Sequence, residues 1–198
     1  VHNTFLRLVR GTGGPGSFLC ILHYWYYKGY ECDAWRKYTT EPQKIFRNQH
    51  NQTLVVREDL QESYAAAAFE TLTTKEAKYG NRVHFTLHRF RDTVPKEGLP
   101  VAFSIQVNRK TYTMYCEKDQ QEVRFREGEV PDDIPGDTSD IIFNQRNFES
   151  SNQQAFRFES ALMRGFFLAF KVAENTPSEL ILKKPKDEPD ESTKIIPF

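Results

Sequence analysis

The chain lacks an excess of charge of either sign, a dense set of cysteines and any long apolar run. Its 198 residues include 27 Lys and Arg against 27 Asp and Glu, a balance that argues against nucleic acid or an acidic membrane surface as the main partner. The three cysteines, Cys20, Cys32 and Cys116, cannot form a dense disulfide framework. They fit a reducing compartment, or a secreted protein that does not depend on disulfides. The longest apolar run, 18–27, is about half as long as a membrane span needs to be. No small-residue cleavage pattern follows that run, so we expect neither a membrane span nor a secretory signal peptide.

The sequence also lacks a catalytic or metal-binding motif. Gly11–Gly16 matches G-x-G-x-x-G, but no alternating strand and helix pattern follows, so we interpret it as a flexible glycine loop. His84 and His88 share the polar face of a predicted strand without a third ligand nearby in sequence, and we expect both to be solvated. Cys116 ends a strand pattern and is expected to be a buried or half-buried thiol. We therefore expect no cofactor and no metal.

Short strands are what the sequence does contain. Val83, Phe85 and Leu87 alternate with polar residues, and Val101, Phe103, Ile105 and Val107 form a second alternating series. This period of two is typical of half-buried strands. Weaker patterns occur at 54–56, 112–114, 123–125, 141–143, 156–158, 166–170, 180–182 and 195–198. Turn residues separate these segments and no regular helices alternate with them, which predicts an all-β sandwich or barrel.

Two segments interrupt this regular texture. The stretch 58–79 contains Ala65–Ala68 and partial helical spacing, and we expect one or two helical turns there within a long insertion loop. The charged, proline-bearing stretch 183–193 is expected to be a solvated loop.

The second half of the chain carries a family resemblance. The stretch 131–146, PDDIPGDTSDIIFNQR, and the stretch 158–169, FESALMRGFFLA, resemble corresponding segments of the interleukin-1 cytokine family, and 180–184, LILKK, adds a further match. Arg164 and Phe170 depart from the wider family signature as the interleukin-18 branch of the family does. The resemblance extends over 45–198 and is weak in 58–79.

The resemblance implies a β-trefoil, with twelve strands of which six form a short barrel and six cap it. Two strands without a visible pattern would lie in 58–80 and near 148–152. The expected core residues are Leu54, Val56, Val83, Phe85, Leu87, Phe103, Ile105, Phe125, Ile142, Phe158, Phe167, Leu168 and Leu182.

The resemblance also implies a pro-inflammatory cytokine that works by binding and not by catalysis. Its partners would be receptor chains with immunoglobulin-like domains and a soluble binding protein, with no nucleic acid, and it would be a monomer. The receptor-binding residues carried over by motif position are Arg47, Arg91, Asp92, Arg126, Asp137 and Asp140. The family's acidic residue just after the first arginine is replaced by Asn51, which puts that contact in doubt and also forms a glycosylation sequon with Thr53.

A processing site is implied as well. Tyr30-Glu-Cys-Asp33 followed by Ala34 resembles the site at which an inflammatory caspase matures this branch of the family. Residues 1–33 would then be a pro-segment and 34–198 the cytokine domain. The precursor would be cytoplasmic, and the mature form would be secreted without a signal peptide. We expect an extended, exposed linker around the site, because 28–42 shows no strand pattern.

Other interpretations remain open at this stage. The chain could be another ligand or an antagonist of the interleukin-1 family. It could also be a growth-factor-type trefoil that binds heparin, for which the nearest basic cluster is Lys183, Lys184 and Lys186. A hydrolase that uses Cys116 or the two histidines is the enzyme alternative.

Overall fold

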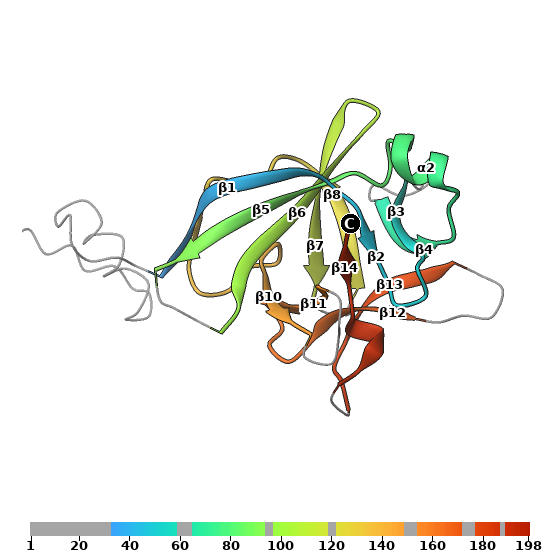
Figure 1. The fold of residues 1–198 in the computed structure, drawn as a ribbon. Coiled ribbons are helices and arrows are strands. Elements are labelled where there is room, and N and C mark those ends of the chain that lie inside the picture. Colours follow the sequence, from blue (N-terminus) through green and yellow to red (C-terminus); the bar gives the residue numbers. More distant parts are fainter. Residues whose placement is uncertain are drawn as a thin grey trace, which may run out of the picture. The chain divides into compact units, whose positions relative to one another are not determined.

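The part of the chain that the structure describes is almost entirely β-structure (Figure 1). The computed structural model describes residues 33–58, 65–93, 97–118, 122–148, 154–171, 177–186 and 189–198, which belong to one unit, Asp33–Phe198. Its strands are β1 (Ala34–Lys44), β2 (Phe46–Arg47), β3 (Thr53–Glu58), β4 (Ala65–Glu70), β5 (Phe85–Asp92), β6 (Leu99–Val107), β7 (Lys110–Glu117), β8 (Glu122–Glu127), β9 (Asp133–Pro135), β10 (Phe143–Asn147), β11 (Phe156–Ser160), β12 (Phe167–Lys171), β13 (Ser178–Lys183) and β14 (Ile196–Pro197). The described helical segments are α2 (Thr74–Tyr79) and the 3-10 turn η1 (Glu191–Thr193).

Six strands close a barrel within the described residues. Strand β5 pairs with β6, β6 with β10 and β10 with β11. Phe156 of β11 bridges to Ile195, which directly precedes β14, and β14 pairs with β2. The ring is completed where Lys44, at the end of β1 and two residues before β2, pairs with Phe85 of β5.

Three hairpins cover one end of this barrel. They are β3–β4, β7–β8 and β12–β13. Each hairpin pairs with the other two, through Ala65 with Phe125, Ile181 with Glu122, and Ser178 with Phe69. A six-stranded barrel capped by three mutually paired hairpins is a β-trefoil, so the predicted fold is confirmed.

Phenylalanines fill the centre of the barrel. The Phe46, Phe103 and Phe158 rings meet edge to face, with centroids 5.3 Å apart for Phe46 and Phe103 and 5.1 Å apart for Phe103 and Phe158. Such edge-to-face pairs contribute beyond the area that they bury. All thirteen predicted core residues are buried. The apolar alternation therefore located the core correctly.

A second, smaller core lies on the outer face of β5 and β6. Trp35 of β1 and Phe90 of β5 are buried there with Ile134 of β9 and Ile142. Strand β1 pairs with β5 along most of its length, and β9 pairs with the first residues of β1. The trefoil thus carries an added extension made of β1 and β9, and Figure 1 shows β1 running beside β5.

The predictions for the start of β1 and for the alanine run of the insertion differ from the structure. Residues 34–44 form a strand, although 28–42 was expected to be an extended, exposed linker. Ala65–Ala68 lie in β4, because pairing of that segment with β3 overrides the helix propensity of alanine. The one or two helical turns predicted within 58–79 are confirmed by α2, which begins after Thr73, where Thr73 and Glu76 make a capping box.

The remaining sequence predictions have mixed outcomes. Strand β4 is the strand expected within 58–80. Of the strand expected near 148–152, only Phe148 is described, and it lies outside any strand. The stretch 183–193 is not simply a solvated loop, since Lys183 ends β13 and Thr193 of η1 is 2% exposed. The glycine loop, the aromatic run 18–27 and the residues preceding Asp33 lie outside the described residues.

Candidate functional site

Arg126 and Asp140, two of the predicted receptor contacts, form an ion pair with each other. Arg126 of β8 donates from Nη1 to Asp140 Oδ2 at 2.6 Å and from Nη2 to Oδ1 at 3.3 Å. The same guanidinium lies over the Tyr115 ring, 4.9 Å from its centroid. Asp140 is also fixed through its backbone, because its carbonyl accepts a bond from the Cys116 N–H at 2.8 Å. The two side chains are half exposed, so they present a rigid, locally neutral surface.

Arg91 and Asp92 are the last two residues of β5. Arg91 is exposed, and its guanidinium lies 5.0 Å from the centroid of the Tyr38 ring of β1. Tyr38 is exposed because it is the unpaired residue of a bulge between Lys37 and Thr39. In the register, Arg91 is opposite Arg36, and half-buried Asp92 is opposite Trp35.

Two like charges directly opposite each other on neighbouring strands are unfavourable. Arg36 is 53% exposed and has a loose ion pair with Asp133 of β9, at 3.9 Å. We call Arg36, Tyr38 and Arg91, with Asp133 beside them, the β1–β5 patch. It is an exposed surface on which positive charge exceeds negative charge.

The other predicted contacts are placed elsewhere. Arg47 of β2 donates to Asn51 Oδ1 at 3.1 Å and stacks on the Phe198 ring at 4.1 Å. The amide of Asn51 therefore supplies a neutral acceptor for Arg47. Asp137 is exposed in the loop between β9 and β10 that also carries Asp140. Figure 1 shows β2 far from the end of β5, so Arg47 does not join the β1–β5 patch.

The predicted cleavage site is part of the β-structure. The carbonyl of half-exposed Asp33 accepts a bond from the Gly136 N–H at 2.7 Å. The Ala34 N–H donates to Thr93 Oγ1 at 3.0 Å, and the Ala34 carbonyl accepts from the Thr93 N–H at 3.1 Å. Both polar groups of the 33–34 peptide bond are thus hydrogen-bonded to the fold. The exposed linker that the sequence predicted is absent from 34 onward.

Two side chains that follow that bond hold β1 in place. Trp35 is 1% exposed in the second core. Lys37 donates from Nζ to the Val130 carbonyl and to Asp132 Oδ1, both at 2.7 Å. Sequence reasoning missed Trp35 and Lys37 because a single apolar residue followed by mixed polar residues gives no periodic signal. An isolated tryptophan just after the composition change was the one available hint.

His88 is buried under this extension, and the prediction that it is solvated is wrong. It is 7% exposed, and its Nε2 lies 2.8 Å from Ser104 Oγ. Burial, reinforced by the Lys37 ammonium, lowers the pKa of His88 from 6.5 to about 4. His84 is half exposed, with Nε2 3.0 Å from the Lys78 carbonyl oxygen. The two histidines therefore do not form a site together.

The structure also places Cys116 and the residues that could bind a metal. Cys116 is buried as expected, and burial raises the pKa of its thiol to about 12, which disfavours the reactive thiolate. Over the described ranges, no group of three or more His, Cys, Asp or Glu side chains is placed to hold a metal ion. Neither described helical segment has the length or the apolar character of a membrane span.

Comparison with known proteins adds to this geometry. Residues 74–196 match the family described as Interleukin-1 / 18. The chain is 47% identical to interleukin-18 of Gallus gallus over 182 residues, covering 90% of this chain and 87% of that one. It is 34% identical to interleukin-18 of Bos taurus over 149 residues, covering 75% of this chain and 72% of the other. Among solved structures, chicken interleukin-1 beta superposes with a TM-score of 0.57 at 16% identity, covering 82% of this chain and 98% of that one. At that identity the structural likeness supports the fold alone.

Proposed function

Because this chain belongs to the interleukin-1/18 family of cytokines, we propose that it is an interleukin-18-type ligand for receptor chains with immunoglobulin-like domains. The observation that carries the proposal is the 47% identity to chicken interleukin-18 over 87% of that relative's length. The ligand would act by binding alone. This agrees with a buried, protonated Cys116 and with histidines that are held apart in the fold.

The β1–β5 patch is the surface that supports receptor binding best. Its opposed Arg36 and Arg91 and its exposed Tyr38 combine positive charge with an aromatic surface. Arginine and tyrosine are both enriched at the energetic centres of protein interfaces. An acidic receptor loop laid across the two arginines would relieve their mutual repulsion. Complementary charge of this kind mainly raises the association rate and fixes the register of the complex.

Arg126 and Asp140 are less direct candidates. Each already neutralises the other through the bidentate contact. A receptor that bound either one alone would have to leave the other partly desolvated and unpaired, which is costly. We therefore propose that a receptor uses this pair only as a whole, and that Arg47 and Asp137 belong to separate contacts.

We also propose maturation by an inflammatory caspase between Asp33 and Ala34. The Asp33 side chain is half exposed and can be gripped by a basic protease pocket. The peptide bond itself is held by Gly136 and Thr93, whereas a protease needs an extended, freed segment. Cleavage would therefore require local separation of the start of β1 from β5 and β9. The precursor would be cytoplasmic, and the released form would be secreted without a signal peptide.

The experiment uses the full chain, with and without inflammatory caspase treatment, over immobilised ectodomains of interleukin-18-type receptors. We expect a new N-terminus at Ala34 and tighter receptor binding after cleavage. An Asp33→Ala variant is the matched control and should remain intact and weakly binding. Cleavage that is unaffected by this substitution would overturn the processing site. A cleaved chain that binds none of these ectodomains would overturn the receptor assignment.

The heparin-binding alternative finds little support in the basic cluster. Lys183 donates to Asp190 at 2.7 Å and to Ser192 at 2.9 Å, so a nearby carboxylate offsets its charge. Heparin binding needs several cations free of such partners. We expect weak retention on a heparin column at physiological salt. Elution only at high salt would favour the growth-factor-type interpretation instead.

A further inference from the structure

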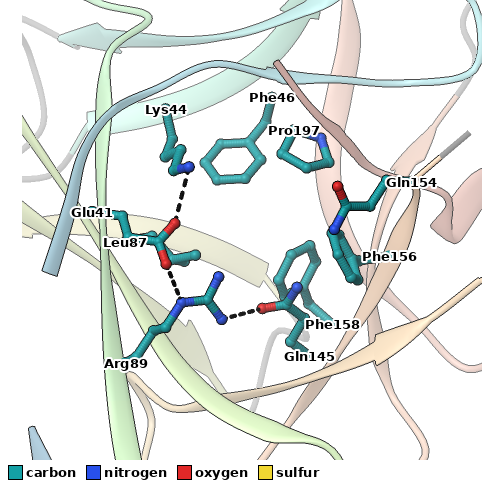
Figure 2. A pocket seen from close by; sticks show the side chains of 10 residues that line it. All are labelled: Glu41, Lys44, Phe46, Leu87, Arg89, Gln145, Gln154, Phe156, Phe158 and Pro197. Carbon is teal, nitrogen blue, oxygen red and sulfur yellow. Dashed lines mark hydrogen bonds and ion pairs between the residues drawn. The ribbon is translucent and has the colours of Figure 1, made fainter. Parts of the chain in front are cut away.

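A pocket of about 150 Å³ lies within the barrel. Its lining residues come from β1, β2, β5, β10, β11 and β14, and from Gln154, which lies two residues before β11. Among the residues that the structure describes, none of the lining residues belongs to the three cap hairpins. The pocket therefore occupies the barrel mouth that the hairpins leave uncovered. Figure 2 shows two different sides to it. Glu41, Lys44 and Arg89 gather on one side, and the rings of Phe46, Phe156, Phe158 and Pro197 lie on the other, where the amides of Gln145 and Gln154 are also found.

A backbone irregularity places the charged side. Glu41 and Lys44 are three residues apart on β1, so in a regular strand their side chains would point to opposite faces. Here the register shifts between them, and Gln43 adopts a φ of +61°. This bulge turns both side chains to the same side, where they form an ion pair at 2.9 Å. A non-glycine residue with positive φ is strained, and such strain is concentrated at functional sites.

The charges of this side do not cancel. Each Glu41 oxygen already has a cationic partner, with Oε1 bound by Arg89 Nε and Oε2 by Lys44. Two cations thus surround one carboxylate, which leaves one positive charge in excess. Arg89 also donates from Nη1 to Gln145 Oε1 at 3.1 Å. A guanidinium has five N–H donors and an ammonium three, so both cations keep further donors for another acceptor.

The apolar side is suited to a flat ring. Phe46 and Phe158 are almost fully buried, and Phe156 is half exposed beside them. Aromatic rings pack favourably in edge-to-face contact with one another. The pocket, which both polar and apolar groups line, has about the volume of an enclosed apolar cavity that takes up benzene. The pocket therefore has room for one ring and a small substituent.

We infer that this pocket is a binding site for a small aromatic carboxylate. The ring would lie against Phe46, Phe156 and Phe158, and the carboxylate would accept hydrogen bonds from Lys44 and Arg89. The ligand's single negative charge matches the single positive charge in excess. None of the pocket's lining residues is among those proposed for receptor binding or for cleavage at Asp33. The inference therefore does not depend on the proposed function.

Sodium benzoate is the probe, added to the isotopically labelled full chain and followed by NMR. We expect chemical-shift changes centred on Leu87, Gln145 and Phe158, with an affinity in the millimolar range that suits so small a ligand. Benzamide keeps the ring without the charge, and acetate keeps the charge without the ring. Each should bind at least about tenfold more weakly, because a charge-assisted bond or a buried ring is worth more than that factor.

Variants separate this pocket from general attraction to a cationic surface. Arg89→Gln and Lys44→Gln should each weaken benzoate binding about tenfold. The matched control is Arg36→Gln, on the same strand as Lys44 but outside the pocket, and it should bind benzoate like the wild type. Lys44 is at the rim, so its variant remains informative if Arg89→Gln unfolds. Three results would each overturn the inference. They are chemical-shift changes scattered over the surface, benzamide binding as tight as that of benzoate, and equal losses of benzoate affinity in Arg36→Gln and Lys44→Gln.

Discussion

Mild acid should destabilise this fold through His88. The imidazole is buried between the barrel and the β1 extension, with Nε2 beside Ser104 Oγ at 2.8 Å. Burial and the Lys37 ammonium lower its pKa to about 4, while the Glu129 and Asp132 carboxylates act in the opposite direction with smaller effect. The folded protein therefore resists protonation of this side chain at pH values where a free histidine accepts a proton.

The sign and size of the effect follow from the two pKa values. Above pH 6.5 the imidazole is neutral in both states, so it has no effect on the free energy of unfolding. Below pH 6.5 the unfolded chain binds the proton and the folded chain does not until about pH 4, so stability falls across this window. At about 1.4 kcal/mol per pH unit, the loss is about 2 kcal/mol at pH 5 and about 3 kcal/mol when complete. The lowered pKa values of Glu41 and Asp132 affect stability only in more acidic solution, where their stabilising charges are lost.

Urea denaturation of the full chain at about pH 7.5 and pH 5 measures this loss. His88→Gln keeps a hydrogen-bonding side chain toward Ser104 but cannot titrate, so it should lose about 2 kcal/mol less than the wild type between the two pH values. His84→Gln is the matched control and should behave like the wild type. Equal losses in the wild type and His88→Gln would refute the reasoning. Should His88→Gln not fold, an NMR titration of the wild-type ring with a midpoint near 6.5 would refute it equally well.

Three further outcomes are expected from single substitutions. Phe158→Ala, inside the phenyl cluster of the barrel, should cost about 3–5 kcal/mol in urea denaturation, and an unchanged midpoint would contradict its place in the core. Arg91→Glu should weaken receptor binding at least about tenfold in surface plasmon resonance without changing thermal stability, whereas Arg109→Glu, in the β6–β7 turn, should not. Trp35→Ala should speed caspase cleavage at Asp33 by loosening β1, as followed on gels; an unchanged rate would show that opening of β1 does not limit cleavage.

The barrel could be predicted from sequence because its inner face leaves a local signal. Val101, Phe103 and Ile105 repeat every second residue and all point into one core. The same rule failed at His88, since a strand with both faces covered does not alternate. Its outer face is buried by Trp35, which comes from a segment about fifty residues earlier. No window around His88 contains that information.

The sequence did not predict the strand structure of β1 or of Ala65–Ala68, for related reasons. Strand β1 has one buried residue and two register shifts, so its sequence shows neither a period of two nor a period of 3.6. Ala65–Ala68 shows a helical preference that six residues of pairing with β3 outweigh. In both segments the pairing partner, and not the segment's own composition, decides the structure.

The candidate site was the least predictable part, because the availability of a charge depends on what lies beside it in space. Arg126 and Asp140 are separated by fourteen positions and meet only through the course of the β9–β10 loop. Their bidentate contact means that reversing either charge would disturb the fold and any interface together, so such a variant could not isolate receptor binding. Arg91 instead lies opposite another arginine and over an exposed tyrosine. Reversing the charge of Arg91 replaces its repulsion from Arg36 with attraction, so this substitution is not expected to weaken the fold. A loss of binding in Arg91→Glu with stability maintained therefore reports on the receptor alone, and for that reason the β1–β5 patch is the sharper test of the proposed function.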